Sequence, residues 1–202
     1  MSEDNSWDAY AEGWDEDPGA RSYAEQAYAL LSELLTSLGR SLDGARVLDF
    51  GCGTGLLSEK LAPAQVLALD GSLAMIEVLR AKGLPHVDAR VGTVPADGVL
   101  PEEISGPYGL IVASSVCAFL GKGYPGVLRT LAGALQPGGL FVQWDWAWTG
   151  GDDPYGLTSQ EISEALDGAD LERVRLEPAF TMETPKGEAE VMWAVGRRPE
   201  VT

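Results

Sequence analysis

The sequence predicts an α/β fold with a mostly parallel sheet, and three observations support this. Apolar runs of strand length, such as 66–70 and 108–113, alternate with longer segments whose apolar residues recur at helical spacing. A glycine-rich turn, residues 51–55, directly follows the first apolar run. The last two predicted strands, 171–182 and 190–195, are joined by a short turn. The expected fold class is therefore α/β with an antiparallel C-terminal hairpin.

Length and composition favour one domain that acts on small molecules. The 202 residues suit a single domain, with an N-terminal helical lid or cap segment over residues 1–40 and the sheet core over residues 45–197. Acidic residues number 31 and basic residues 14, and the resulting net charge of −17 repels phosphate backbones. A small molecule is therefore a better candidate substrate than a nucleic acid.

Cysteine content and hydropathy predict a cytoplasmic protein. The two cysteines, Cys52 and Cys117, are too few for a disulfide framework and wrongly spaced for a zinc site. The first residues lack the basic and apolar regions of a secretion signal, and no apolar run approaches the roughly 20 residues that span a bilayer. We expect a reducing compartment and no membrane association.

The first predicted elements are helical. Trp7, Tyr10 and Trp14 are spaced to share one helical face, which covers either the core or a bound ligand. A second helix is expected from about residue 20 to residue 38, with an apolar stripe of tyrosine, alanine and leucines. Gly39 is its expected C-cap.

The glycine-rich turn is the strongest candidate for a ligand site. The apolar strand 47–50 leads into the spacing D-x-G-x-G-x-G that starts at Asp49, and a short helix is expected from Leu56 to Leu61, ended by Pro63. Glycine at position 53 lets a ligand approach the backbone. A dinucleotide fingerprint would need its third glycine at position 56, and the Asp49 carboxylate suits an ammonium or sulfonium better than a pyrophosphate. The remaining interpretation is a turn without a ligand.

The second predicted strand ends in Asp70, about 20 residues beyond the first glycine. A carboxylate at this place accepts hydrogen bonds from both ribose hydroxyls, whether the ribose belongs to an adenosyl group or to NAD. Ser72 is expected to cap the next helix, which runs to about Lys82. Met75 either contacts an adenine or belongs to the helix core. His86, before the third strand 87–91, is expected to be an exposed loop residue.

The middle of the chain brings polar and aromatic residues to two further strand ends. The strand 108–113 delivers Ser114, Ser115 and Cys117 to the expected ligand edge. A helix over 127–135 and a turn over 136–139 precede a strand that starts at Leu140. That strand ends in three tryptophans on one face: Trp144, Trp146 and Trp148. Farther on, Thr158 and Glu161 have the spacing of a capping box.

Three of these stretches resemble one protein family. Residues 49–55 closely resemble motif I of the class I S-adenosylmethionine-dependent methyltransferases of small-molecule type. Residues 70–76 resemble the acidic loop of that family, and residues 137–142 resemble its proline-glycine-glycine strand. The resemblance covers roughly positions 7–197. It implies a three-layer, Rossmann-like sandwich with a seven-stranded sheet of order 3-2-1-4-5-7-6, and S-adenosyl-L-methionine as cofactor.

The resemblance also implies where the cofactor lies. Asp49 would help to fix its amino group, often through water, and Tyr10 or Trp14 would close over its methionine part. Thr93 stands where the family usually has an acidic residue, so adenine recognition is expected from the backbone of Thr93 and Val94, or from Asp97. The expected cofactor-binding residues are Tyr10, Trp14, Asp49, Gly51, Cys52, Gly53, Gly55, Asp70, Gly71, Met75, Thr93, Val94 and Ser114.

The expected reaction is direct in-line transfer of a methyl group to a small-molecule acceptor. The activated methyl group needs mainly an oriented acceptor and a dry site, so no dedicated base is expected. Ser115 and Asp145 are the candidates for a catalytic role. The expected acceptor pocket is lined by Trp146, Trp148 and Cys117, with the indoles facing Tyr10 and Trp14, unless these indoles belong to the core.

No metal is expected: Asp145, Asp152 and Asp153 could bind magnesium, but the neighbouring strand end offers Ser114 and Ser115 and no further acid. Two other functions fit parts of the pattern. One is a regulatory module that binds the cofactor without catalysis. The other is an NAD-dependent oxidoreductase, which Leu56 and the closing hairpin disfavour.

Overall fold

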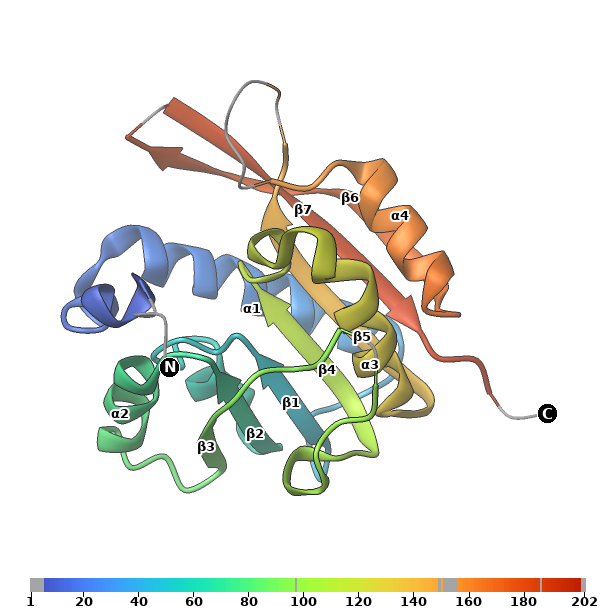
Figure 1. Ribbon diagram of the computed structural model, residues 1–202, viewed down its shortest axis with the longest axis horizontal. Helices are drawn as coiled ribbons and strands as arrows, with labels where there is room; N and C mark the ends of the chain where they lie inside the picture. Colours follow the sequence, from blue (N-terminus) through green and yellow to red (C-terminus); the bar gives the residue numbers. More distant parts are fainter. Residues whose placement is uncertain (1–5, 97, 149, 151–155, 186, 201–202) are drawn as a thin grey trace. The chain divides into compact units, whose positions relative to one another are not determined.

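The computed structural model describes residues 6–96, 98–148, 150, 156–185 and 187–200 (Figure 1). Within these ranges seven strands form one sheet, in the order β3-β2-β1-β4-β5-β7-β6. The strands are β1 (Arg46–Phe50), β2 (Gln65–Asp70), β3 (Val87–Val91), β4 (Tyr108–Ser114), β5 (Leu135–Trp146), β6 (Glu172–Thr184) and β7 (Gly187–Arg197). β1, β2 and β3 pair in parallel, as do β4 and β5, whereas β7 runs antiparallel to both β5 and β6. The predicted fold class, strand order and closing hairpin are confirmed.

The chain divides into two compact units, residues 1–93 and 94–202. The first contains β1 to β3 with α1 (Pro18–Ser37) and α2 (Leu73–Ala81). Asp17 starts α1, because its side chain accepts the Ala20 N–H at 2.7 Å and Pro18 needs no partner in the first turn. The buried stripe of α1 consists of Tyr23, Ala24, Ala27, Leu31, Leu34 and Leu35. The helix expected over 20–38 is thus confirmed.

The short helix expected from Leu56 to Leu61, ended by Pro63, is present but starts two residues later and is a 3₁₀ helix. The chain makes turns through Leu57, and only a 3₁₀ helix of four residues, η3 (Ser58–Leu61), follows. Pro63 forces Ala62 into extended geometry (φ −58°, ψ 142°), so too few residues remain to nucleate an α-helix. No helix N-terminus of useful length therefore faces a ligand here.

The leading segment also differs from the expected single helix. It consists of two 3₁₀ helices, η1 (Ser6–Tyr10) and η2 (Trp14–Glu16). Gly13, at φ +87°, adopts a left-handed conformation between them and interrupts the helical path. The aromatic rings still meet: the Trp7 ring centroid lies 5.9 Å from that of Tyr10 and 6.1 Å from that of Trp14.

The second unit contains β4 to β7, the 3₁₀ helices η4 (Glu102–Ile104) and η5 (Cys117–Gly123), and the helices α3 (Tyr124–Gly133) and α4 (Ser159–Gly168). The capping box at the start of α4 is confirmed, since the Thr158 hydroxyl accepts the Glu161 N–H and the Glu161 carboxylate accepts the Thr158 N–H. β5 begins at Leu135, five residues before the expected start. At this added start, the pairing of β5 with β4 is irregular, because its register shifts between Tyr108 and Leu110. None of the helices in the described part of the chain is long and apolar enough to cross a membrane.

Candidate functional site

The glycine loop, residues 51–55, folds back over the end of β2. The N–H groups of Gly51 and Cys52 both donate to the Leu69 carbonyl oxygen, at 2.8 and 3.1 Å. The Gly55 N–H closes the turn by donating to the Cys52 carbonyl oxygen at 2.9 Å. The loop therefore lies at the carboxyl ends of β1 and β2, where ligands of open α/β sheets bind.

Two glycines of this loop serve different purposes. A Cβ atom at Gly55 would overlap the Leu79 side chain, so glycine there allows α2 to pack against the loop. A Cβ atom at Gly53 would have only the Met75 sulfur within reach, at 4.0 Å. Gly53 therefore faces open space beside a buried thioether, and that space is available to a ligand.

Asp70 holds the loop and the next helix together. Its Oδ2 atom accepts the Gly53 N–H and its Oδ1 atom accepts the Ser72 N–H, each at 2.8 Å. Burial is the main cause that raises the pKa of this carboxyl group, and these two donors partly offset it. Each carboxylate oxygen has a second lone pair, so Asp70 can also accept ribose hydroxyls. Ser72 caps α2 by accepting the Met75 N–H at 3.1 Å, as expected.

Asp49 is a completely buried acid with one unsatisfied oxygen. Its Oδ2 atom accepts the Ser58 hydroxyl at 2.5 Å, whereas its Oδ1 atom has no hydrogen-bond partner among the described residues. Burial raises the pKa of this carboxyl group to about 7. An ammonium group, directly or through a water molecule, would satisfy Oδ1 and stabilise the carboxylate form. The residues present thus fit the amino group of an amino-acid ligand.

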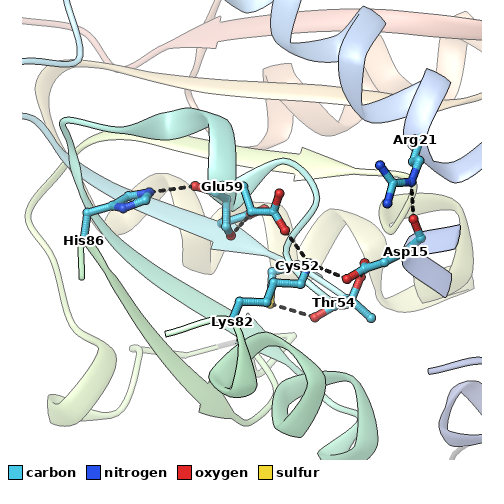
Figure 2. A network of polar contacts seen from close by, with 10 residues as sticks. Asp15, Arg21, Cys52, Thr54, Glu59, Lys82 and His86 are labelled. Atoms are coloured by element: carbon cyan, nitrogen blue, oxygen red, sulfur yellow. Dashed lines mark hydrogen bonds and ion pairs between the residues drawn. The ribbon is translucent and has the colours of Figure 1, made fainter. Parts of the chain in front are cut away.

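The leading segment contacts the glycine loop through Asp15. The Thr54 hydroxyl donates to Asp15 Oδ1 at 2.5 Å, and the Lys82 ammonium group lies 2.6 Å from Asp15 Oδ2 (Figure 2). Of the aromatic residues expected to close over a cofactor, Trp14 is half-buried and Tyr10 is 58% exposed. Asp15 and Lys82 are functional candidates that were not expected from the sequence. Nothing in their spacing, 67 residues apart, indicates a contact.

The other residues singled out from the sequence in this part of the chain differ in burial. Met75 is 3% exposed and packs inside, whereas Gly71 and Thr93 are exposed. Val94, the first residue of the second unit, is buried, and Asp97 lies outside the described residues. His86 is half-buried, not exposed as expected, and its Nε2 atom lies 3.1 Å from the Ser58 carbonyl oxygen (Figure 2).

In the second unit, β4 ends in a strained serine. Ser115 has φ 56°, a left-handed conformation that residues other than glycine rarely adopt. Its N–H donates to the Trp144 carbonyl oxygen at 2.7 Å, and its hydroxyl accepts the Trp146 indole N–H at 2.9 Å. The structure thus brings together Ser115, a catalytic candidate, and Trp146, an expected residue of the acceptor pocket. Ser114, an expected cofactor-binding residue, is the last residue of β4.

Asp145 and Cys117 lie inside the second unit. Asp145 is fully buried and accepts the backbone N–H groups of Cys117 at 3.3 Å and Ala118 at 3.0 Å. Burial raises its pKa to about 7, and burial together with the Asp145 charge raises the pKa of the Cys117 thiol. Because side chains alternate along a strand, Asp145 and Trp146 point to opposite faces of β5. The two catalytic candidates thus have different partners: Ser115 binds the Trp146 indole, and Asp145 binds backbone N–H groups.

The three tryptophans differ in burial. Trp144 is fully buried, Trp146 is half-buried, and Trp148, beyond the end of β5, is 46% exposed. That Trp146 and Trp148 face Tyr10 and Trp14 stays a prediction. Asp152 and Asp153 lie outside the described residues, and no cluster of His, Cys, Asp and Glu in the described ranges has the arrangement of a metal site.

The buried Asp145 carboxyl group predicts a pH effect on stability. Its pKa is about 7 in the folded chain and has the ordinary value of 3.8 when unfolded. The folded state therefore binds the proton more tightly, and this group lowers the free energy of unfolding as the pH rises from about 4 to 7. Asp145→Asn cannot titrate, so we expect its stability relative to the wild type to increase over that range and to stay constant above pH 8.

Urea unfolding of both proteins at several pH values measures this difference. Asp49, whose pKa is also raised to about 7, titrates in both proteins and cancels in the comparison. A difference in stability that does not change with pH would contradict the assignment.

Comparisons with known proteins agree with the fold and identify a family. Residues 23–171 match the family model described as Methyltransferase domain. Ubiquinone biosynthesis O-methyltransferase of Xanthomonas oryzae pv. oryzae (strain PXO99A) is 38% identical over 107 residues, which cover 50% of this chain and 43% of that protein. Trans-aconitate 2-methyltransferase of Deinococcus radiodurans is 33% identical over 102 residues, which cover 48% of this chain and 36% of that protein.

A solved structure extends the likeness to nearly the whole chain. The N-methyltransferase NodS from Bradyrhizobium japonicum WM9, in complex with S-adenosyl-L-homocysteine, has a TM-score of 0.68 and 20% sequence identity, over 93% of this chain and 91% of that chain. At this identity the likeness shows a shared fold. The sequence matches, in turn, span less than half the length of the two curated relatives.

Proposed function

Because the chain belongs to the methyltransferase domain family, we propose that it transfers a methyl group from S-adenosylmethionine to a small-molecule acceptor. The observation that carries this proposal is the free space at Gly53, whose N–H is bound by Asp70, in the same unit as the unsatisfied oxygen of Asp49. Asp70 has lone pairs for ribose hydroxyls, and Asp49 offers an unsatisfied oxygen for an ammonium group. This donor set suits an adenosyl amino acid better than a pyrophosphate, which two carboxylates would repel.

The mechanism needs little from the protein beyond positioning. S-adenosylmethionine supplies a methyl group that its sulfonium already activates. The residues of the chain would bind and orient this cofactor. Asp70 would accept hydrogen bonds from the ribose hydroxyls, and Asp49 would accept one from the ammonium group. The glycine loop would let the cofactor lie against the backbone. Alignment of the acceptor with the methyl group, and exclusion of water, then lower the barrier. Asp145, which is fully buried and bound to backbone N–H groups, is not needed as a base.

The acceptor side of the proposal rests on Ser115, Trp146 and Trp148. The partly exposed indoles offer ring faces for a flat apolar or cationic molecule, and the serine hydroxyl offers a polar contact. Both curated relatives carry names of small-molecule methyltransferases, and the net charge of −17 disfavours nucleic acid. Both cysteines are free thiols, which is compatible with the reducing cytoplasm.

Thermal unfolding with added ligand tests the cofactor. At 100 times its dissociation constant a ligand stabilises the fold by about 2.7 kcal/mol. For a chain of this size S-adenosylhomocysteine should then raise the melting temperature by about 5–10 °C. A rise with NAD alone would overturn the proposal. Binding of S-adenosylhomocysteine without methyl transfer to any acceptor in a broad panel would instead favour a regulatory module.

We expect Trp146→Ala to impair turnover of the acceptor and to leave cofactor binding almost unchanged. Loss of the indole removes an acceptor ring face and the hydrogen bond to Ser115, so acceptor turnover should fall about tenfold or more. The affinity for S-adenosylhomocysteine should stay within about twofold. Radiolabelled methyl transfer to a panel of small phenols and amines, together with calorimetry, measures both. Trp144→Phe, at the fully buried neighbour, is the control and should affect stability more than turnover.

A further inference from the structure

The leading segment, here residues 6–17, is attached to the glycine loop by a charged network. Asp15 binds the Thr54 hydroxyl through Oδ1 and the Lys82 ammonium group through Oδ2. The same ammonium group lies 2.5 Å from Glu59 Oε1, on η3 just beyond the loop. Figure 2 shows Lys82 reaching both carboxylates, with Thr54 beside Asp15. One cation thus joins the leading segment, the segment after the glycine loop and the end of α2.

This network is shielded from solvent more than an ordinary surface ion pair. The side chains of Lys82, Asp15 and Glu59 are 16%, 26% and 37% exposed, and Thr54 is fully buried. Exposed ion pairs contribute little because water and salt screen them, whereas shielded groups with several partners contribute more. Removal of the ammonium group would leave the carboxylates of Asp15 and Glu59 without their shared cation in this partly shielded region.

A second contact holds the same segment beside Asp70, the residue expected to bind the ribose. The Ser72 hydroxyl donates to Asp8 Oδ1, and the Ser72 N–H donates to Asp70 Oδ1 at 2.8 Å. The leading segment is therefore bound at two places, one on the loop and one beside Asp70. The Arg21 Nε–H also donates to the Asp15 carbonyl oxygen, which orients Asp15 from the start of α1 (Figure 2).

We propose that Lys82 is a positioning residue for the cofactor: it holds Asp15 on Thr54 and thereby keeps the glycine loop in its binding conformation. Lys82 does not need to touch the ligand. Thr54 lies between Gly53, which borders the free space, and Gly55, which packs on Leu79. Release of Thr54 would loosen the backbone on which the cofactor rests. This inference rests on the proposed function, since it assumes that the loop binds an S-adenosyl ligand.

The affinity for S-adenosylhomocysteine, measured by calorimetry, tests the proposal. Lys82→Met keeps most of the aliphatic side chain and removes the charge. We expect it to weaken binding about five- to twentyfold, mainly through faster dissociation. Lys82→Arg retains the charge and should stay within about threefold of the wild type. Lys60→Met, on η3, is the matched control and should bind within about twofold.

The partner of Lys82 is tested by a double-mutant cycle. If Lys82 acts through Asp15, the losses of affinity caused by Asp15→Asn and Lys82→Met should not be additive. The double variant should then bind S-adenosylhomocysteine about as weakly as Lys82→Met alone. Wild-type affinity in Lys82→Met, or fully additive losses, would overturn the proposal. Failure of the wild type to bind S-adenosylhomocysteine would instead overturn the proposed function. If Lys82→Met does not fold, Asp15→Asn alone must show the weaker binding, and wild-type affinity in that variant contradicts the inference.

Discussion

Gly53→Val should lower the affinity for S-adenosylhomocysteine by at least about a hundredfold while the protein still folds. A Cβ atom at this position meets nothing closer than the Met75 sulfur at 4.0 Å, so the branched side chain would occupy the space that the ligand needs. Gly53 has φ +54°, and the left-handed strain of another residue there costs about 1–2 kcal/mol. That cost is a fraction of the typical stability of a domain.

The matched control is Gly39→Val. Gly39 follows α1, has φ +63° and also has open space around a Cβ atom, so the substitution introduces comparable strain outside the glycine loop. Calorimetry should show wild-type affinity for Gly39→Val and no measurable binding for Gly53→Val, with similar melting temperatures. Retained binding in Gly53→Val would mean that the ligand does not use this space.

Asp70→Ala has the second largest expected effect, a loss of affinity of about ten- to a hundredfold. Hydrogen bonds to a charged group contribute about 1.5–3 kcal/mol, and the substitution removes those to the ribose. It also leaves the N–H groups of Gly53 and Ser72 without their acceptor, so the loop and the start of α2 lose a common anchor. We therefore expect a lower melting temperature as well.

Asp88→Ala serves as the control for Asp70→Ala. Asp88 is an exposed acid on the neighbouring strand β3, where it forms an ion pair with Arg90 at 2.7 Å. The measurement is calorimetric titration with S-adenosylhomocysteine for both variants. Equal affinities in Asp70→Ala and the wild type, with an intact fold, would show that the ribose is bound elsewhere.

Local patterns of the sequence predicted most of the fold. The third strand was expected at 87–91 and is found at Val87–Val91, because apolar residues and flanking turns define a short strand well. Ser72 and Thr158 were identified as caps, since a cap depends only on residues one turn away. The positions of Asp49 and Asp70 at strand ends followed in the same way from the strands that carry them.

Long-range contacts explain what could not be predicted. Thr54 and Asp15 are 39 residues apart, and their hydrogen bond depends on the folded path of the leading segment. The opposite orientations of Asp145 and Trp146 follow from strand alternation, but the burial of Asp145 depends on how η5 covers β5. By contrast, the end of the short helix before Pro63 was expected from the sequence, and only its 3₁₀ form was not.

The short η3 helix bears on the electrostatic potential at the glycine loop. A helix of four residues lacks the aligned peptide dipoles that place positive potential at an α-helix N-terminus. Asp49 and Asp70, whose charges add to burial in raising the pKa of the Cys52 thiol, place negative charge at the loop. S-adenosylmethionine carries one more positive charge than S-adenosylhomocysteine, so this potential attracts the donor more strongly than the spent product. On the proposed function, this difference favours exchange of product for donor, and the preference should weaken as ionic strength rises.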